Sequence, residues 1–190
     1  MGTERSDSSG IIEILEARQV YRNRWGMLFD DNVRFPDRTP GTYLRFVWEA
    51  PYSVAVLPVT AAGGLVFVNV FRHASRRWHR EVPKGFGAAD LTPVQAAAGE
   101  LKEETGFFSD AWQNWGTLWT DPGFNAGKCH LFVARNCEKA FEPTPEYSEV
   151  IAGAETLTPD EAAAGLGEGL FDDALTVCLV QRFLLERVAC

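Results

Sequence analysis

Three glutamates fall within five positions of the segment GELKEETG, residues 99–106. On a helix, Glu100, Glu103 and Glu104 share one face, because offsets of three and four residues return to the same side of the helical turn. Lys102 points to the other side, so the three charges have no local counter-charge. Clustered carboxylates on a rigid helix can bind a hard cation such as Mg²⁺, which prefers oxygen ligands. A solvated acidic helix face is the alternative interpretation.

The helix that carries these glutamates has clear start and stop signals. Thr92 predicts an N-cap, Pro93 suits the first helical position, and Gln95 completes a capping box with Thr92. Gly106 suits the left-handed conformation that ends many helices. A helix with both ends specified should hold its carboxylates in a fixed place.

The segment GFGAADLTPVQAAAGELKEETGF, residues 85–107, resembles the Nudix box. In that box a glycine, five residues, a glutamate and seven further residues precede the pattern Arg-Glu-apolar-x-Glu-Glu-x-Gly-apolar. Two positions depart from it, because Leu91 stands where the first Glu belongs and Gly99 where the Arg belongs. The residues in register are Gly85, Glu100, Leu101, Glu103, Glu104, Gly106 and Phe107.

The resemblance extends over most of residues 11–188 and is to the ADP-ribose pyrophosphatase branch of the family. The segment NVFRHASRRWHREVPKGFG resembles the strand and loop that lead into the box there. Pro122 follows the box at about the distance where the branch carries a proline, and EGLFDDALTVCLVQRFL resembles its C-terminal helix. The acidic residue that usually follows the Pro-Gly loop is replaced by the run from Asn125 to Lys128.

This resemblance implies a Nudix pyrophosphohydrolase. It would hydrolyse a nucleoside diphosphate-linked compound, ADP-ribose or another nucleoside diphosphate sugar, to a nucleoside monophosphate and a sugar phosphate. The implied cofactor is Mg²⁺, with Mn²⁺ as an alternative. The general base would come from the late loop PTPEYSEVIAG, where we predict Glu149 and keep Glu146 as the alternative. The remaining implied residues are Glu100, Glu103, Glu104 and the backbone carbonyl of Lys84 for metal, Glu103 also for catalysis, and Arg72, Glu81 and Pro122 for substrate.

A cluster of basic residues is independent of the box. Five of the 18 Lys and Arg residues fall between Arg72 and Lys84 in a chain of net charge -8. Arginine forks suit phosphate oxygens, although an exposed basic loop or a subunit interface would give the same pattern. His73 and His79 are expected on a loop, with surface or packing roles.

The composition argues against two other classes of protein, those that bind nucleic acids generally and those that span membranes. With net charge -8, the chain lacks the basic footprint of a general nucleic-acid-binding protein. No apolar run is long enough to span a bilayer, so we expect no membrane partner. Four scattered cysteines without a CxxC pair predict free thiols and a cytoplasmic location.

The pattern of strands and helices predicts an α/β fold, a Nudix-type α/β/α sandwich with a mixed sheet. We expect a disordered tail over residues 1–10, a small N-terminal antiparallel β region over 11–50 and the Nudix domain over 51–190. The branch commonly dimerises through its N-terminal strands, so the resemblance implies a homodimer. Two alternatives stay open: a catalytically weak Nudix domain that senses a nucleotide, and a Nudix hydrolase for coenzyme A, a nucleoside triphosphate or a dinucleoside polyphosphate.

Overall fold

The computed structural model describes residues 11–188, which form two compact units. The first unit comprises the chain up to Glu49 together with the loop Asp121–Gly127, and the second comprises Ala50–Thr120 and the chain from Lys128 onward. The predicted tail over residues 1–10 lies outside the described residues. The loop 121–127 joins the N-terminal strands even though it is distant in sequence.

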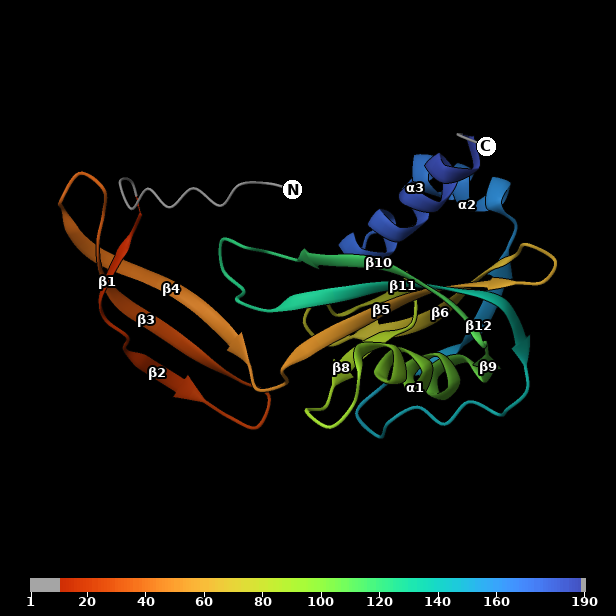
Figure 1. Cartoon of the computed structure of the whole chain (residues 1–190), viewed down its shortest axis with the longest axis horizontal. Helices are drawn as coiled ribbons and strands as arrows, with labels where there is room; N and C mark the ends of the chain where they lie inside the picture. Colours follow the sequence, from red (N-terminus) through yellow and green to blue (C-terminus); the bar gives the residue numbers. More distant parts are fainter. Residues whose placement is uncertain (1–10, 189–190) are drawn as a thin grey trace. The chain divides into compact units, whose positions relative to one another are not determined.

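The first unit is a four-stranded antiparallel sheet (Figure 1). Its strand β3 pairs with each of the other three, and its longest partner is β4, which follows it across a turn. The loop 121–127 adds to this sheet, because the Phe46 N–H donates to Phe124 O at 2.8 Å and the Ala126 N–H donates to Phe46 O at 2.9 Å. The strands are β1 (Glu13–Glu16), β2 (Gln19–Arg22), β3 (Gly26–Arg34) and β4 (Pro40–Trp48).

The second unit is built on an eight-stranded mixed sheet. The path β10-β11-β5-β6-β12 contains one parallel pair, β5 with β11, and its other pairs are antiparallel. Three short strands extend it: β7 on β6, β8 on β5 and β9 on β11. The strands are β5 (Tyr52–Thr60), β6 (Leu65–Arg72), β7 (Arg77–Glu81), β8 (Lys84–Gly87), β9 (Phe107–Phe108), β10 (Ala111–Trp119), β11 (Lys128–Lys139) and β12 (Ile151–Leu157).

Helices cover both faces of this sheet (Figure 1). Helix α1 (Pro93–Thr105) lies on one face, and α2 (Pro159–Glu168) and α3 (Ala174–Val188) lie on the other. This arrangement confirms the predicted α/β/α sandwich with a mixed sheet.

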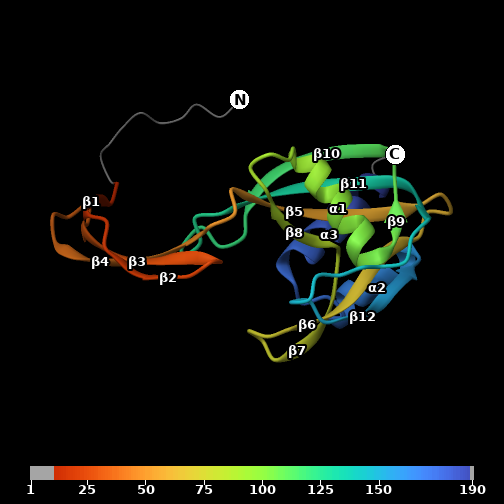
Figure 2. The same cartoon turned by 90° about the horizontal axis from the view of Figure 1, so that it is seen from below.

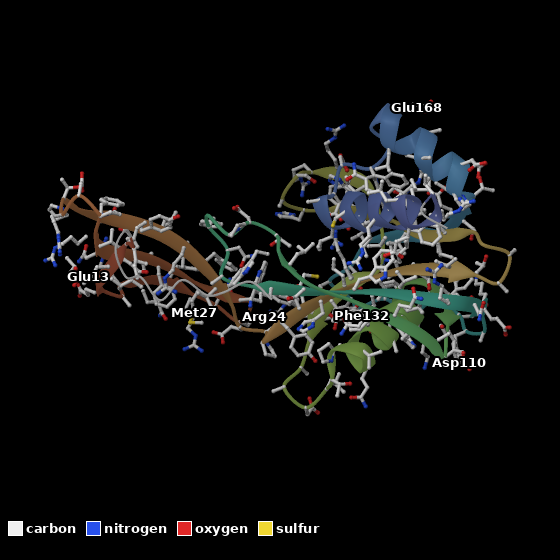
Figure 3. The ribbon with its side chains drawn as sticks, turned by 45° about the horizontal axis from the view of Figure 1, so that its top comes forward. Glu13, Arg24, Met27, Asp110, Phe132 and Glu168 are labelled. Atoms are coloured by element: carbon white, nitrogen blue, oxygen red, sulfur yellow. The ribbon has the colours of Figure 1, made fainter. Side chains whose placement is uncertain are left out.

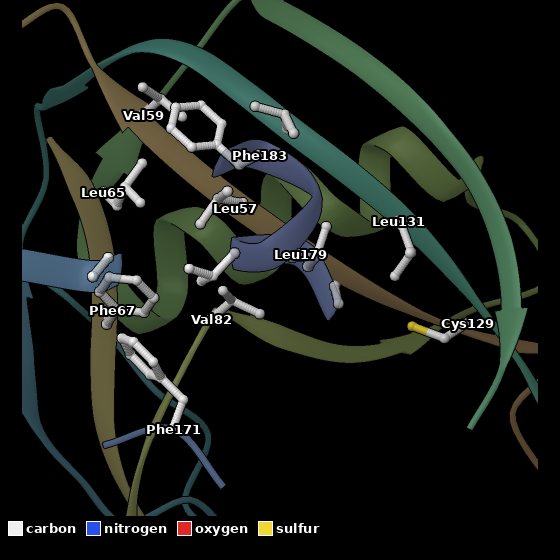
Figure 4. Packing of buried hydrophobic residues seen from close by; sticks show 14 residues of the cluster. Leu57, Val59, Leu65, Phe67, Val82, Cys129, Leu131, Phe171, Leu179 and Phe183 are labelled. Atoms are coloured by element: carbon white, nitrogen blue, oxygen red, sulfur yellow. The ribbon is translucent and has the colours of Figure 1, made fainter. Parts of the chain in front are cut away.

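The central strand β5 explains why the sheet has two cores. It is buried almost throughout, as expected of a strand with both faces covered. Because successive side chains point to opposite faces, Ala55 and Leu57 pack with α2 and α3, whereas Val54 and Val56 pack with α1. Figure 4 shows the first cluster, with Leu179 and Phe183 of α3 lying over β5. Phe132 of β11, labelled in Figure 3, belongs to the second.

The hairpin of β6 and β7 corrects one sequence-based expectation (Figure 2). His79 lies on β7 and not on a loop, paired with Val70. The alternating polar residues of β7 give no apolar period, so the strand is defined by its pairing with β6. His73 does lie in the turn between the two strands.

Two further predictions concern thiols and membranes. Cys129, Cys137 and Cys178 are free, as predicted, and Cys190 lies outside the described residues. None of the helices within residues 11–188 is long and apolar enough to cross a membrane.

Candidate active site

Helix α1 holds all three of the glutamates predicted for metal binding, and its ends are formed as predicted. Thr92 is the N-cap within a complete capping box, and Gly106 ends the helix in the left-handed conformation with φ 74°. The helix packs on the sheet through Ala97 and Leu101. Glu104 shares the buried side, with 2% of its surface exposed, so its charge is held away from water.

Strand β8 brings the first glycine of the box under this helix. β8 pairs with β5, which places Gly85 opposite Val54. A Cβ atom on Gly85 would lie 2.7 Å from Oε2 of Glu100 and closer still to Oε1. Only a glycine therefore lets the Glu100 carboxylate approach this backbone.

The loop between β11 and β12 supplies the third carboxylate. The Thr144 N–H donates to Glu103 O at 2.8 Å, and the Phe71 N–H donates to Val150 O at 2.9 Å. The loop is thereby fixed to α1 at one end and to the end of β6 at the other. Glu149 lies beside the second of these anchors, where it faces the glutamates of α1.

Glu100, Glu104 and Glu149 each place a carboxylate oxygen within 4.8 Å of the other two. Burial raises the pKa of Glu104 to about 9, and the charges of Glu100 and Glu149 add to this effect. Burial also raises the pKa of Glu100 to about 8, helped first by Glu149. Burial raises the pKa of Glu149 as well, to a degree that its hydrogen bond with the Glu146 N–H limits.

This cluster has the donor set that a hard divalent cation needs. Oε2 of Glu104 is buried and has no hydrogen-bond partner among the described residues, which is costly for a carboxylate. Three adjacent negative charges, with Glu104 fully buried among them, would repel each other. A divalent cation would offset these charges and coordinate the unpaired oxygen. The residues present therefore fit a metal ion.

Glu103 lies outside the group of three. Apart from the helix backbone and the two chain neighbours, its Oε1 is the one atom of the described residues within 4 Å of the Cβ position at Gly99, so the Glu103 side chain lies beside that position. Its charge still contributes to the raised pKa of Glu100. Its predicted metal and catalytic roles stay predictions.

The side chains of Arg72 and Glu81, from the ends of β6 and β7, are hydrogen-bonded to each other. The Glu81 carboxylate accepts from Arg72 Nε at 3.0 Å and from its NH2 group at 2.6 Å. Burial alone would lower the pKa of Arg72, but the carboxylate of Glu81, with the charges of Glu104 and Asp173, more than offsets this and the pKa is raised. Glu81 is buried at 2% exposure, and its carboxylate pairs with Arg72 on one side and with Lys84 on the other. The positive charge of Arg72 also favours the ionised forms of Glu100 and Glu104 and so opposes the rise of their pKa values. Arg72 therefore belongs to the same site.

Two further residues predicted for the site, Pro122 and Lys84, lie on other elements. Pro122 lies in the loop 121–127 of the first unit, and its substrate role stays a prediction. Lys84 opens β8, and its Nζ pairs with Glu81 at 2.9 Å and with Asp173 at 2.6 Å. Asp173 was missed by the sequence analysis, where its only signal is its place near the start of the segment predicted as the C-terminal helix.

Comparisons with known proteins agree with this geometry. The family model for the NUDIX domain matches residues 50–180. The ADP-ribose pyrophosphatase of Bacillus subtilis (strain 168) is 30% identical over 137 residues, covering 70% of this chain and 73% of that protein. The methanol dehydrogenase activator of Bacillus methanolicus is 28% identical over 172 residues, covering 90% and 92%.

A solved structure shares the fold over almost the whole length. The crystal structure of an ADP compounds hydrolase superposes with a TM-score of 0.79 at 19% identity, covering 96% of each chain. The match to the family model spans more than half of the chain and includes every carboxylate of the cluster. The chain therefore belongs to the Nudix family of hydrolases and resembles its ADP-ribose pyrophosphatase branch.

Proposed function

We propose that this Nudix hydrolase cleaves the diphosphate bond of ADP-ribose or another nucleoside diphosphate sugar, releasing a nucleoside monophosphate and a sugar phosphate. The observation that carries the proposal is the cluster of Glu100, Glu104 and Glu149 with Arg72 acting on it. Carboxylates for a cation and a guanidinium for phosphate oxygens are together what a diphosphate substrate requires. The likeness to the Bacillus subtilis ADP-ribose pyrophosphatase supports the choice of substrate.

Mg²⁺ is the proposed cofactor, and Mn²⁺ is the alternative. Glu100 and Glu104 would hold it, with Glu103 and the carbonyl of Lys84 as the further predicted ligands. When bound, a divalent ion neutralises charge on the phosphate oxygens and lowers the pKa of a water molecule. The raised pKa values of Glu100 and Glu104 mean that both must release protons on binding it.

Glu149 is the proposed general base. Its raised pKa brings a carboxylate closer to the range in which it can accept a proton at neutral pH. The backbone N–H of Glu146 holds one of its oxygens at 3.2 Å, which fixes its direction. Glu146 is itself exposed, which makes it the weaker candidate.

Arg72 is the proposed phosphate ligand, and Glu81 would hold it in place. A planar guanidinium that is bound on one edge by Glu81 can still offer its other N–H groups to phosphate oxygens. Arg72→Ala should therefore mainly raise KM for the substrate.

We also propose a homodimer. Every residue of β1 and β2 is exposed, including Ile14 at 56%, Val20 at 48% and Tyr21 at 57%. Apolar side chains gathered on a small sheet are typical of an interaction surface. A second copy of the chain is the proposed occupant, because the resembling branch dimerises through this region.

A nucleotide sensor with weak catalysis is the second candidate. The departures at Leu91 and Gly99 favour it, since the box arginine that would stand beside Glu103 is absent. The relative from Bacillus methanolicus carries the name of an activator of another enzyme. The third candidate is a hydrolase for coenzyme A, a nucleoside triphosphate or a dinucleoside polyphosphate.

A substrate panel with product identification tests these candidates. The purified protein would be incubated with ADP-ribose, other nucleoside diphosphate sugars, coenzyme A, ATP and a dinucleoside polyphosphate, with Mg²⁺ or Mn²⁺. Release of a nucleoside monophosphate and a sugar phosphate from the first two supports the proposal. Binding without turnover supports the sensor, and preference for another diphosphate supports the third candidate.

A further inference from the structure

Four side chains form a row of alternating charges that leads away from the carboxylate cluster: Arg72, Glu81, Lys84 and Asp173. Glu81 pairs with Arg72 at 2.6 Å and with Lys84 at 2.9 Å, and both cations share its Oε2 atom. Lys84 in turn pairs with Asp173 at 2.6 Å. We call these four residues the charge row.

The charge row is mostly removed from water. The exposed fractions of the side chains are 3% for Glu81, 15% for Lys84, 19% for Asp173 and 34% for Arg72. Buried ions persist when they are paired, and removing one partner leaves the others uncompensated. Two positive and two negative charges balance here, so each member depends on its neighbours.

The far end of the charge row is fixed to the start of α3. The carboxylate of Asp173 accepts from the Thr176 backbone N–H at 3.0 Å and from its hydroxyl at 2.7 Å, the arrangement of a helix N-cap. The Thr176 hydroxyl oxygen also accepts from the Val82 N–H at 3.0 Å. The segment that carries Glu81 and Lys84 is thus held by α3 at two points.

We propose that the Lys84 ammonium and Asp173 are positioning residues that hold Glu81, and through it the Arg72 guanidinium, in the orientation that binds phosphate. The inference rests on the proposed role of Arg72 as the phosphate ligand. The side chain of Lys84 thereby gains a role separate from that of its backbone carbonyl. No residue of the charge row beyond Arg72 needs to touch the substrate.

The physical reason lies in the shared oxygen of Glu81. With Arg72 as its only partner, the carboxylate could follow the guanidinium as it moves. Lys84 gives Glu81 a second anchor, and Asp173 fixes the ammonium that provides it. Arg72 then meets a fixed anion on one side and presents its free N–H groups in a fixed direction, which lowers the ordering cost of binding.

Binding of ADP without metal provides the test, because it reports on Arg72 and not on catalysis. Calorimetry in EDTA would compare the wild type with Asp173→Asn, which keeps a good N-cap but removes the charge that Lys84 pairs with. Loss of an indirect positioning contact should raise the Kd for ADP by about tenfold. Asp173→Glu, which keeps the charge, should retain most of the affinity.

The neighbouring residue gives a matched control. Asp172 lies on the same loop, and its carboxylate contacts His79 at 2.6 Å outside the charge row. Asp172→Asn should therefore leave the Kd for ADP unchanged. With metal present, Asp173→Asn should raise KM while kcat changes much less.

Lys84→Met removes the ammonium while leaving the Asp173 cap of α3 in place. This variant therefore tests the same contact if Asp173→Asn does not fold. It should weaken ADP binding by a similar factor. The double variant with Asp173→Asn should bind ADP as Lys84→Met does, because both changes act through one contact.

Equal ADP affinity in the wild type and in both single variants would overturn the inference, even where melting temperatures differ. A wild type without measurable ADP binding would overturn it too. The proposed function fails on separate grounds, namely if the wild type with metal does not release a nucleoside monophosphate.

Discussion

The carboxylate of Glu100 lies so close to the backbone of Gly85 that a Cβ atom on Gly85 would be 2.7 Å from its Oε2 and would overlap its Oε1. The two residues come from different elements, β8 and α1, and they define the spacing between them. The glycine that opens the box is thus required by the position of a carboxylate 15 residues later in the sequence.

Gly85→Ala should therefore disturb the metal site more than the fold. The added methyl group must displace Glu100, and we expect metal affinity to fall about 10- to 100-fold, as when a supporting contact of a ligand is lost. Titration calorimetry with Mn²⁺ would measure it. Gly167→Ala in α2 is the matched control, because nothing lies within 4 Å of its Cβ position. Equal Mn²⁺ affinity in both variants would refute the steric argument.

Glu104→Gln should abolish most turnover without unfolding the protein. The amide keeps the shape of the side chain but removes a ligand charge, so we expect kcat/KM to fall by at least about a hundredfold at limiting Mg²⁺. The melting temperature of the metal-free protein should stay level or rise, since the neutral amide needs no proton uptake to be buried uncharged. Glu168→Gln at the exposed end of α2 makes the same chemical change and should retain full activity. Wild-type turnover in Glu104→Gln would remove this residue from the site.

The stability of the metal-free protein should fall as the pH rises. The pKa of Glu104 is raised from 4.5 to about 9 and that of Glu100 to about 8. Between roughly pH 5 and pH 9 the folded protein therefore binds more protons than the unfolded chain, and its stability decreases with pH. Calorimetric melting in EDTA would measure this decrease. Glu104→Gln should flatten the profile, and an equal slope in both proteins would contradict the assignment.

Local signals in the sequence were sufficient to predict α1. Thr92, Gln95 and Gly106 act on residues within one turn, so both ends of the helix could be read from composition and spacing. The proximity of Glu149 to Glu100 depends instead on hydrogen bonds between distant segments, such as that from the Phe71 N–H to Val150 O. The hydrophobic periodicity of the sequence does not indicate which distant segments form such hydrogen bonds.

The pairing of Lys84 with Asp173 could not be predicted from the sequence either. The resemblance assigned Lys84 a backbone role only, and nothing near it in the chain indicates where its ammonium would lie. Its partner Asp173 lies just before α3, far away in the sequence, and the two side chains meet only once the fold has formed. Strand β7 was missed for a related reason, because its residues pair with β6 but alternate no apolar side chains.

Val20→Lys should convert the proposed dimer to a monomer. Val20 is 48% exposed on β2, where a lysine would place a charge on the surface that a second copy is proposed to cover. Light scattering at micromolar concentration would measure the mass. Leu185→Lys is the matched control, because Leu185 on α3 is 70% exposed and should tolerate the charge without a change of mass. A monomeric wild type would exclude the dimer.

The position of Gly99, where the box has an arginine, leaves space for a Cβ atom. Apart from the helix backbone and the two chain neighbours, the one atom of the described residues within 4 Å of its Cβ position is Oε1 of Glu103, at 3.8 Å, so a side chain can leave the helix here without a clash at Cβ. A glycine inside a helix also costs about 1 kcal/mol relative to alanine. Two effects of a substitution are therefore expected, one on the stability of α1 and one on the carboxylates, and they can be separated.

Gly99→Ala and Gly99→Arg should both raise the melting temperature, by about 2–4 °C for a gain of this size in a chain of this length. Only Gly99→Arg adds a guanidinium beside Glu103, where a charge-assisted hydrogen bond can restrain the carboxylate. We therefore expect only the arginine variant to lower the Mg²⁺ concentration needed for half-maximal turnover. Leu91→Glu together with Gly99→Arg should lower it further, with positive coupling between the two positions in a double-mutant cycle. If the alanine and arginine variants show the same Mg²⁺ dependence, the missing arginine does not limit this site, and helix packing alone accounts for the glycine.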